Sequence, residues 1–131
     1  MQKIAVLDDD EHWCHTIKRF FRNDFEVTTF QDVQTFLDSP IESYDLIIVD
    51  FTITPSHRYE QEKTGIEIIN QLRIRLKKPP KLVLTSAFIS KNDSGIAANI
   101  SNIADQILPK DLGLDQILQS IKNLLRVEHP S

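Results

Sequence analysis

The chain has 131 residues, enough for a single domain with one hydrophobic core and its covering helices. It is 40% hydrophobic and 26% charged, and its formal net charge of −4 comes from interspersed acids and bases, which argues against direct binding of nucleic acid. No apolar run approaches the roughly eighteen residues of a membrane span, and the single cysteine, Cys14, excludes an internal disulfide. We therefore expect one soluble cytoplasmic domain over residues 1–131.

The first part of the chain predicts two strands and two helices. The apolar run Ile4–Leu7 is typical of a strand, and it ends in a cluster of acids at residues 8–11. Residues 11–22 predict an amphipathic helix, in which we expect Trp13 to be a core residue. The apolar positions at helical spacing are Trp13, Ile17, Phe20 and Phe21. An alternating, more exposed strand over residues 25–30 and a short helix over residues 31–37 follow.

The central strand is predicted at residues 44–50. Leu46 to Val49 is an unbroken aliphatic run, too short for a core helix and followed at once by the carboxylate of Asp50. Such a run is typical of a strand buried on both faces in the middle of a parallel sheet. Asp50 would then lie at the carboxyl end of a central strand, where open α/β sheets bind their ligands. A lone Asp at that point could equally cap the next turn.

The segment after Asp50 is unusual. Residues 51–63 form a polar stretch that is long for a loop between a strand and a helix. Thr64 to Glu67 has the spacing of a capping box, which predicts the start of a helix. Apolar residues on one side of that helix are Ile66, Ile69, Leu72 and Leu76. Residues 77–80, Lys-Lys-Pro-Pro, end it.

The last part of the chain completes an alternating pattern. It predicts a buried strand over residues 82–85, a weak helix over residues 90–101, a short strand over residues 106–108 and a clear amphipathic helix over residues 114–126. Five strands alternate with five helices. This order predicts an α/β fold, a doubly wound five-stranded parallel sheet of the flavodoxin-like (βα)5 type.

Polar residues follow four of the predicted strands, and the carboxyl ends of parallel strands meet at one edge of the sheet. These residues are Asp8, Asp9, Asp50, Thr85 and Lys110. Crowded carboxylates repel one another unless a cation lies among them, and an all-oxygen set suits Mg²⁺. A lysine and a hydroxyl nearby would complete a binding place for a phosphoryl group. Taken singly, Lys110 could be a surface lysine, Thr85 a turn residue, and the first two acids a favourable charge at a helix N-terminus.

Taken together, the motifs resemble the receiver domain of bacterial response regulators, over essentially the whole chain. The residues that carry the resemblance are Val6-Leu7-Asp8-Asp9, Asp45-Leu46-Ile47-Ile48-Val49-Asp50, Leu82-Val83-Leu84-Thr85 and Leu108-Pro109-Lys110. Each motif alone is weak, but five positions in the right order on the right elements make a specific combination.

The resemblance implies a role for each site residue. Asp50 would be the phosphoacceptor, attacking a phosphohistidine of a sensor histidine kinase or phosphotransfer protein. Asp8 and Asp9 would hold Mg²⁺ together with Asp50 and the backbone carbonyl of Thr52. Thr85 would hydrogen-bond a phosphoryl oxygen, and Lys110 would pair with Asp50 at rest and with the phosphoryl group afterwards. Metal and lysine would neutralise charge that develops during phosphoryl transfer.

Three departures from the family pattern concern how the signal is read out. Ile107 stands where the family usually has an aromatic switch residue, so that ring cannot act in its usual form. The family's usual proline four positions after the acceptor is displaced to Pro55 in the long loop. Ile103-Ala104 replaces the Gly-Ala that usually precedes the last strand. Thr52 and Ala87 are the positions that would tune the lifetime of the aspartyl phosphate.

The resemblance also implies partners and limits. A downstream protein effector or a dimer partner would bind the surface of the fourth helix, the last strand and the fifth helix, with no nucleic acid and no membrane involved. The chain would not be an enzyme beyond its own phosphorylation and dephosphorylation. One alternative is a receiver-like interaction module that works without phosphate, which Ile107 favours. Another is a phosphatase of the haloacid-dehalogenase type, which usually needs an acid at the position of Thr52.

Overall fold

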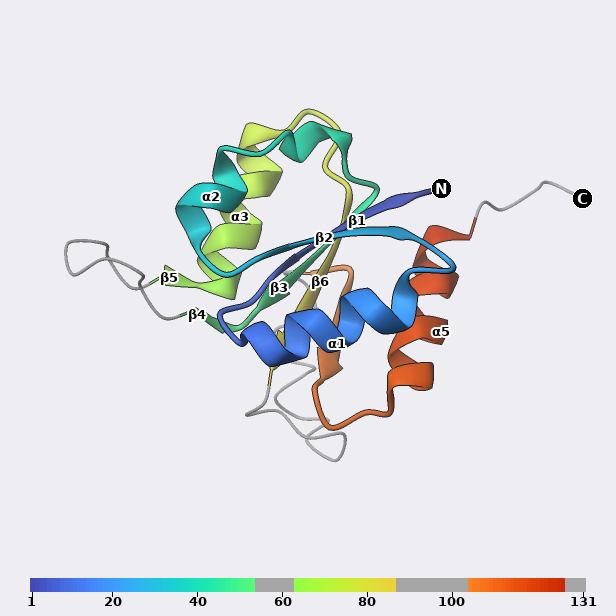
Figure 1. The fold of residues 1–131 in the computed structure, drawn as a ribbon. Helices are drawn as coiled ribbons and strands as arrows, with labels where there is room; N and C mark the ends of the chain where they lie inside the picture. Colours follow the sequence, from blue (N-terminus) through green and yellow to red (C-terminus); the bar gives the residue numbers. More distant parts are fainter. Residues whose placement is uncertain (54–62, 87–103, 127–131) are drawn as a thin grey trace, which may run out of the picture.

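The computed structural model describes residues 1–53, 63–86 and 104–126, with only the backbone described at residues 52, 53, 63 and 64. Its centre is a five-stranded sheet in the order β2-β1-β3-β6-β7, in which every neighbouring pair is parallel. Figure 1 shows helices on both faces of this twisted sheet. The prediction of a doubly wound, five-stranded parallel sheet is confirmed.

The first half of the chain forms β1 (Lys3–Leu7), α1 (Glu11–Phe21), β2 (Glu26–Phe30) and α2 (Val33–Leu37). Both helices begin at an aspartate that accepts a hydrogen bond from a backbone N–H three residues later. Asp10 accepts from Trp13 in α1, and Asp32 accepts from Thr35 in α2. A short 3₁₀ turn (Ile41–Ser43) then leads into β3 (Leu46–Asp50), which is buried along its whole length as predicted.

The second half forms β4 (Thr52–Ile53), β5 (Lys63–Thr64), α3 (Gly65–Arg75), β6 (Lys81–Ser86), β7 (Gln106–Pro109) and α5 (Leu114–Leu125). Treating residues 51–63 as a loop was wrong at its ends, because β4 and β5 pair there as an antiparallel hairpin. Backbone pairing satisfies donors and acceptors that a plain loop would leave to water. The helix predicted over residues 90–101 lies outside the described residues.

Each face of the sheet has its own hydrophobic cluster. On one face, α1 and α5 pack through Cys14, Ile17, Phe21, Ile117 and Ile121. On the other, α2 and α3 pack through Val33, Phe36, Ile68, Ile69 and Leu72. Side chains of one strand alternate between the faces, so neighbouring residues of β1 and β3 enter opposite clusters. Two cores hold the central strands, and therefore their ends, in fixed positions.

Two predictions about the core of α1 are wrong. Phe20 remains 41% exposed, because the buried face of the helix runs through Cys14, Ile17 and Phe21. Those positions are three and four residues apart, and Phe20 projects to one side of that stripe. Trp13 is only partly buried and lies at the margin of the cluster. Within the described ranges, no helix is long and apolar enough to cross a membrane.

Candidate functional site

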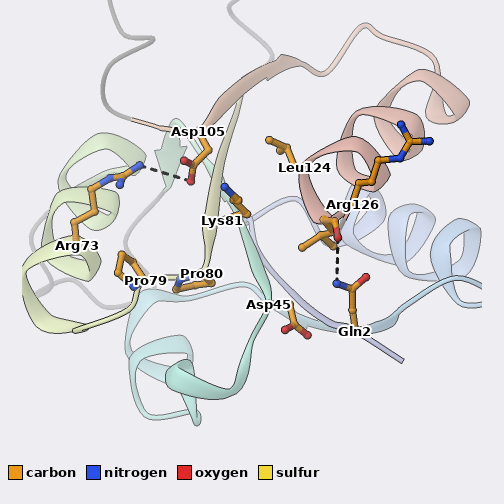
Figure 2. A pocket seen from close by; sticks show the side chains of 10 residues that line it. Gln2, Asp45, Arg73, Pro79, Pro80, Lys81, Asp105, Leu124 and Arg126 are labelled. Atoms are coloured by element: carbon orange, nitrogen blue, oxygen red, sulfur yellow. Dashed lines mark hydrogen bonds and ion pairs between the residues drawn. The ribbon is translucent and has the colours of Figure 1, made fainter. Parts of the chain in front are cut away.

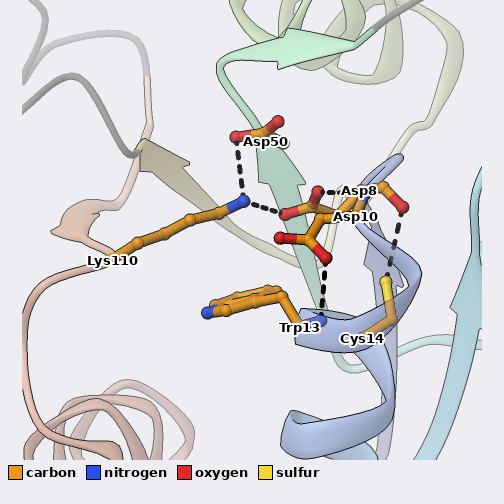
Figure 3. A network of polar contacts seen from close by, with 6 residues as sticks. All are labelled: Asp8, Asp10, Trp13, Cys14, Asp50 and Lys110. Atoms are coloured by element: carbon orange, nitrogen blue, oxygen red, sulfur yellow. Dashed lines mark hydrogen bonds and ion pairs between the residues drawn. The ribbon is translucent and has the colours of Figure 1, made fainter.

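The predicted site residues come together at the carboxyl edge of the sheet. Asp8 follows β1, Asp50 ends β3, Thr85 lies near the end of β6, and Lys110 follows β7. The register explains this convergence, because Asp50 pairs directly with Thr85 across neighbouring strands. Figure 3 shows Asp8 and Asp50 on adjacent strands with the Lys110 side chain reaching between them.

The three acids form a group that fits a hard cation. One carboxylate oxygen from each of Asp8, Asp9 and Asp50 lies within 4.8 Å of the others. Ligands of one octahedral Mg²⁺ ion lie about 3 to 4 Å apart, since each Mg–O distance is about 2.1 Å. Small side-chain rotations therefore suffice to bring these oxygens onto one ion, with water completing the shell. The donor set, all oxygen and mostly carboxylate, is the one that Mg²⁺ prefers.

Lys110 supplies the positive charge inside this group. Its Nζ lies 2.6 Å from Asp8 Oδ2 and 3.6 Å from Asp50 Oδ1, and its side chain is only 14% exposed. Burial by itself lowers the pKa of a lysine, but the hydrogen bond to Asp8 and the charges of Asp8 and Asp50 outweigh it and raise the pKa of Lys110. The ammonium therefore stays charged at neutral pH.

One lysine does not neutralise the two buried acids completely. Burial, followed by repulsion from Asp8, raises the pKa of Asp50 to about 7, although Lys110 opposes the shift. Burial likewise raises the pKa of Asp8, against the hydrogen bonds from Lys110 and from the Asp10 backbone N–H. Excess negative charge in a buried cluster favours the binding of a cation.

Thr85 contributes a buried hydroxyl that has no hydrogen-bond partner among the described residues. The residue is completely buried, yet its Oγ1 has no hydrogen-bond partner among the described residues. Leaving a buried hydroxyl without a partner costs about 1 to 3 kcal/mol. Such a group beside Asp50 is suited to a ligand oxygen that arrives during function.

Two further residues contribute to the site, and sequence reasoning missed the role of the first, Asp10. Asp10 donates its backbone N–H to Asp8 Oδ1 at 2.9 Å and caps α1, so it fixes the orientation of the first acid. The Trp13 ring lies 4.8 Å from the Lys110 Nζ, which makes it a wall of the site. The sequence does indicate that Trp13 lies near the acids, because it follows them by about one helical turn. Beneath them, burial raises the pKa of Cys14 to about 12, and its neutral thiol donates to the Asp8 carbonyl.

Other predicted residues have partial outcomes. Thr52 begins β4 two residues after Asp50, and its carbonyl remains a predicted metal ligand. Ile107 is partly buried against the cluster on the α2–α3 face, and Ala104 is buried beside it. Pro55, Ala87 and Ile103 lie outside the described residues. The capping box of Thr64 and Glu67 stays a prediction, because the Thr64 side chain is not described.

A hollow of about 390 Å³ opens at the opposite, amino edge of the sheet. Figure 2 shows Asp105 paired with Arg73 on one side and Gln2 reaching α5 on the other. Asp105 Oδ2 also accepts the Leu82 backbone N–H at 2.7 Å, and Asp45 Oδ2 accepts that of Lys3 at 2.7 Å. Both carboxylates are thus occupied by hydrogen bonds from the backbone. Among the described residues that line this hollow, we therefore find no group of unpaired carboxylates like the one at the carboxyl edge.

No family model matches the chain. It is 29% identical to the response regulator MprA of Mycolicibacterium vanbaalenii, in an alignment that covers 98% of this chain and 52% of that protein. The chain thus spans about half the length of the curated relative that it matches.

Solved structures share the fold. The signal receiver domain of a putative LuxO repressor from Vibrio parahaemolyticus matches with a TM-score of 0.76 and 16% identity, covering 95% of this chain and 89% of that one. The response regulator TrrA of Thermotoga maritima, solved in complex with Mg²⁺ and BeF, matches with a TM-score of 0.75 and 24% identity, covering 95% and 99%. These comparisons confirm the resemblance to response regulator receiver domains and show that the chain has their flavodoxin-like fold.

Proposed function

We propose that this chain is a phosphoacceptor receiver domain of a two-component or phosphorelay system, in which Asp50 is phosphorylated in the presence of Mg²⁺. The observation that carries the proposal is the set of groups around Asp50. Around it, at the carboxyl ends of β1, β3, β6 and β7, lie two further acids, one partly buried lysine and one hydroxyl that has no partner among the described residues. This is the chemistry that holding and transferring a phosphoryl group requires.

In the proposed reaction, a carboxylate oxygen of Asp50 attacks the phosphorus of a phosphohistidine. The new O–P bond forms as the P–N bond breaks, and the departing imidazole nitrogen keeps the bonding electrons and takes a proton from water. Asp8 and Asp9 would hold Mg²⁺ with Asp50, and the ion would neutralise charge on the phosphoryl oxygens. Asp50 has to be ionised to attack, and Lys110 favours that form.

The other two groups act on the product. The Lys110 ammonium lies within 3.6 Å of Asp50 Oδ1, so it can reach a phosphoryl oxygen attached there after a small movement. The Thr85 hydroxyl, which has no partner among the described residues, can donate to a second oxygen. The Lys110 contact is stronger with the dianionic phosphoryl group than with the carboxylate, and the Thr85 contact forms with the phosphoryl group, so both stabilise the phosphorylated state.

Acetyl phosphate provides the direct test. Protein incubated with Mg²⁺ and this small donor should gain one phosphoryl group by intact mass, and the gain should require both the metal and Asp50. Asp50→Asn should abolish it, whereas Asp45→Asn, a matched change at the amino edge, should leave it intact. Metal-dependent phosphorylation that survives in Asp50→Asn would refute the assignment.

The proposal extends to partners. The donor would be a histidine kinase or phosphotransfer protein, and the output a protein contact made by the fourth helix, β7 and α5. The fourth helix lies outside the described residues. We infer no activity on other substrates, and a cytoplasmic location fits the free, buried Cys14.

A receiver-like module that signals without phosphate is the second candidate. It is favoured by Ile107, an aliphatic residue packed against the core at the position where the resemblance leads us to expect a switching ring. Protein that binds neither Mg²⁺ at millimolar concentration nor a phosphoryl group would support this candidate over the first.

A further inference from the structure

Trp13 lies at the site but has no role in the phosphoryl transfer proposed above. It is the third residue of α1, and its backbone N–H is fixed by Asp10 Oδ1 at 3.1 Å. Its partly buried ring packs against the hydrophobic cluster on the α1–α5 face. The same ring lies 4.8 Å from Lys110 Nζ, measured to its centroid. The ring is thus anchored by both backbone and packing, while the lysine that it contacts belongs to another element.

Lys110 needs an external constraint of this kind. Its ammonium sits at the end of a flexible four-carbon stem that carries about 2 kcal/mol of rotamer entropy. Its polar partners lie on one side, with Asp8 at 2.6 Å and Asp50 at 3.6 Å. Figure 3 shows the Trp13 ring on the opposite side of the ammonium from Asp50. The negative face of an indole attracts a cation, and indole is the strongest such partner among the aromatic side chains.

We propose that Trp13 is a positioning residue, which holds the Lys110 ammonium among the acids by a cation–π contact. The kinetic consequence rests on the function proposed above. A movement of about 1 Å would bring the ammonium from Asp8 to a phosphoryl group on Asp50 without leaving the ring. Trp13 therefore keeps the lysine available for phosphoryl transfer and limits its excursions into solvent.

Fluorination of the indole separates this role from simple packing. Fluorine atoms withdraw electron density from the ring face and change its shape little, so they weaken a cation–π contact and preserve the packing. The chain has a single tryptophan, so fluorotryptophan supplied during expression labels Trp13 alone. The probes are 5-fluorotryptophan and 5,6,7-trifluorotryptophan in the full chain, with acetyl phosphate and saturating Mg²⁺.

We expect the phosphorylation rate to fall stepwise with the number of fluorines, by about 2- to 5-fold overall, the range that a cation–π contact supplies. Trp13→Phe should retain part of the rate and Trp13→Leu less. In a Lys110→Met background, the same ring changes should have no further effect, because the cation is gone. Equal rates across the fluorinated series, or full additivity with Lys110→Met, would overturn the proposal.

A second readout does not depend on phosphorylation. The ε-methylene resonance of Lys110, identified by its absence in Lys110→Met, should be shifted upfield by the indole ring and should relax as a restrained group. Trifluorination should increase its mobility, whereas Phe20→Leu, a matched aromatic change on the exposed side of α1, should not. A mobile Lys110 with an ordinary shift in the unsubstituted protein would disprove the contact. Restrained Lys110 in a protein that never accepts phosphate would instead refute the proposed function alone.

Discussion

The two edges of the sheet use the same residue types in opposite ways. At the amino edge, Asp45 and Asp105 each accept a backbone N–H at 2.7 Å, and Arg73 lies beside Asp105. At the carboxyl edge, Asp8 and Asp50 both lie beside the ammonium of Lys110. The Asp45 and Asp105 carboxylates are thus each bound to a backbone donor. In the second pair Asp8 also accepts the Asp10 backbone N–H, but the two acids share the ammonium of Lys110.

The difference shows how to recognise a functional acid in this fold. A carboxylate that holds a backbone N–H lowers the free energy of the folded state, and its removal should damage stability. A carboxylate buried next to another one raises that free energy until a cation or ligand arrives. The sheet therefore uses one edge to stabilise the fold and keeps the other ready for binding. Four experiments test this contrast, beginning with the largest expected effect.

Gly65→Ala should disrupt the carboxyl edge most strongly. A Cβ at this position would overlap the carbonyl oxygen of Asp50 and lie 2.8 Å from Leu84 Cδ1. Because a strand end has to move to relieve the overlap, we expect a loss of about 3 kcal/mol in the free energy of unfolding by denaturant titration. Gly113→Ala is the control, since its Cβ would approach only the ends of the flexible Asp115 and Gln116 side chains. Equal losses in the two variants would contradict this explanation.

Asp105→Ala should show the stabilising role of the amino edge. It leaves the Leu82 N–H without this acceptor and removes one ion pair of Arg73, so we expect a loss of about 2 kcal/mol in the free energy of unfolding. Asp24→Ala breaks a more exposed ion pair with Lys122 and should cost under about 1 kcal/mol. Phosphorylation by acetyl phosphate should persist in both variants. A stability unchanged by Asp105→Ala would remove the contrast between the edges.

Asp50→Asn should raise the free energy of unfolding, whereas Asp105→Ala should lower it. The folded pKa of about 7 exceeds the ordinary value of 3.8, so the folded state binds the proton more tightly than the unfolded state does. Stability from this group is therefore greatest below pH 4 and declines as the pH rises to about 7. We expect Asp50→Asn to gain about 1 to 2 kcal/mol at pH 8 without metal, and little at pH 4. Asp45→Asn should show no such pH-dependent gain, and thermal melts at both pH values decide the matter.

Mg²⁺ should offset the free-energy cost of the crowded carboxylates at the carboxyl edge. At five times its dissociation constant, a ligand of the folded state adds about 1 kcal/mol to the free energy of unfolding. We expect this gain in the unsubstituted protein and its loss in Asp8→Asn, measured by thermal melts with and without the ion. Asp105→Asn should respond to Mg²⁺ like the unsubstituted protein. An equal response in Asp8→Asn would show that Mg²⁺ binds somewhere other than the predicted cluster of Asp8, Asp9 and Asp50.

The sequence predicted most of the sheet because its signals are local. Buried strands such as Leu46–Val49 are continuous aliphatic runs, and the carboxyl ends of parallel strands have to meet at one edge. The placement of Asp8, Asp50, Thr85 and Lys110 followed from that geometry. The predictions that were wrong concern side-chain positions that depend on how one helix or strand packs against another. Whether Phe20 or Cys14 faces the sheet, and which ring lies over Lys110, depends on helix rotation, which the periodicity fixes only roughly.

The antiparallel pairing of β4 and β5 brings together the two points of the chain at Ile53 and Lys63. Phe51 donates its backbone N–H to Thr85 O at 2.7 Å, which ties the start of the hairpin to β6, and Gly65 donates to Phe51 O at 2.6 Å, which ties the end of the hairpin to its start. Each doubling of a closed loop costs only about 0.6 kcal/mol. An epitope, a protease site or a small reporter domain grafted between Ile53 and Lys63 would therefore leave the geometry of Asp50 unchanged. The fold offers protein engineers an attachment point beside its own reactive centre.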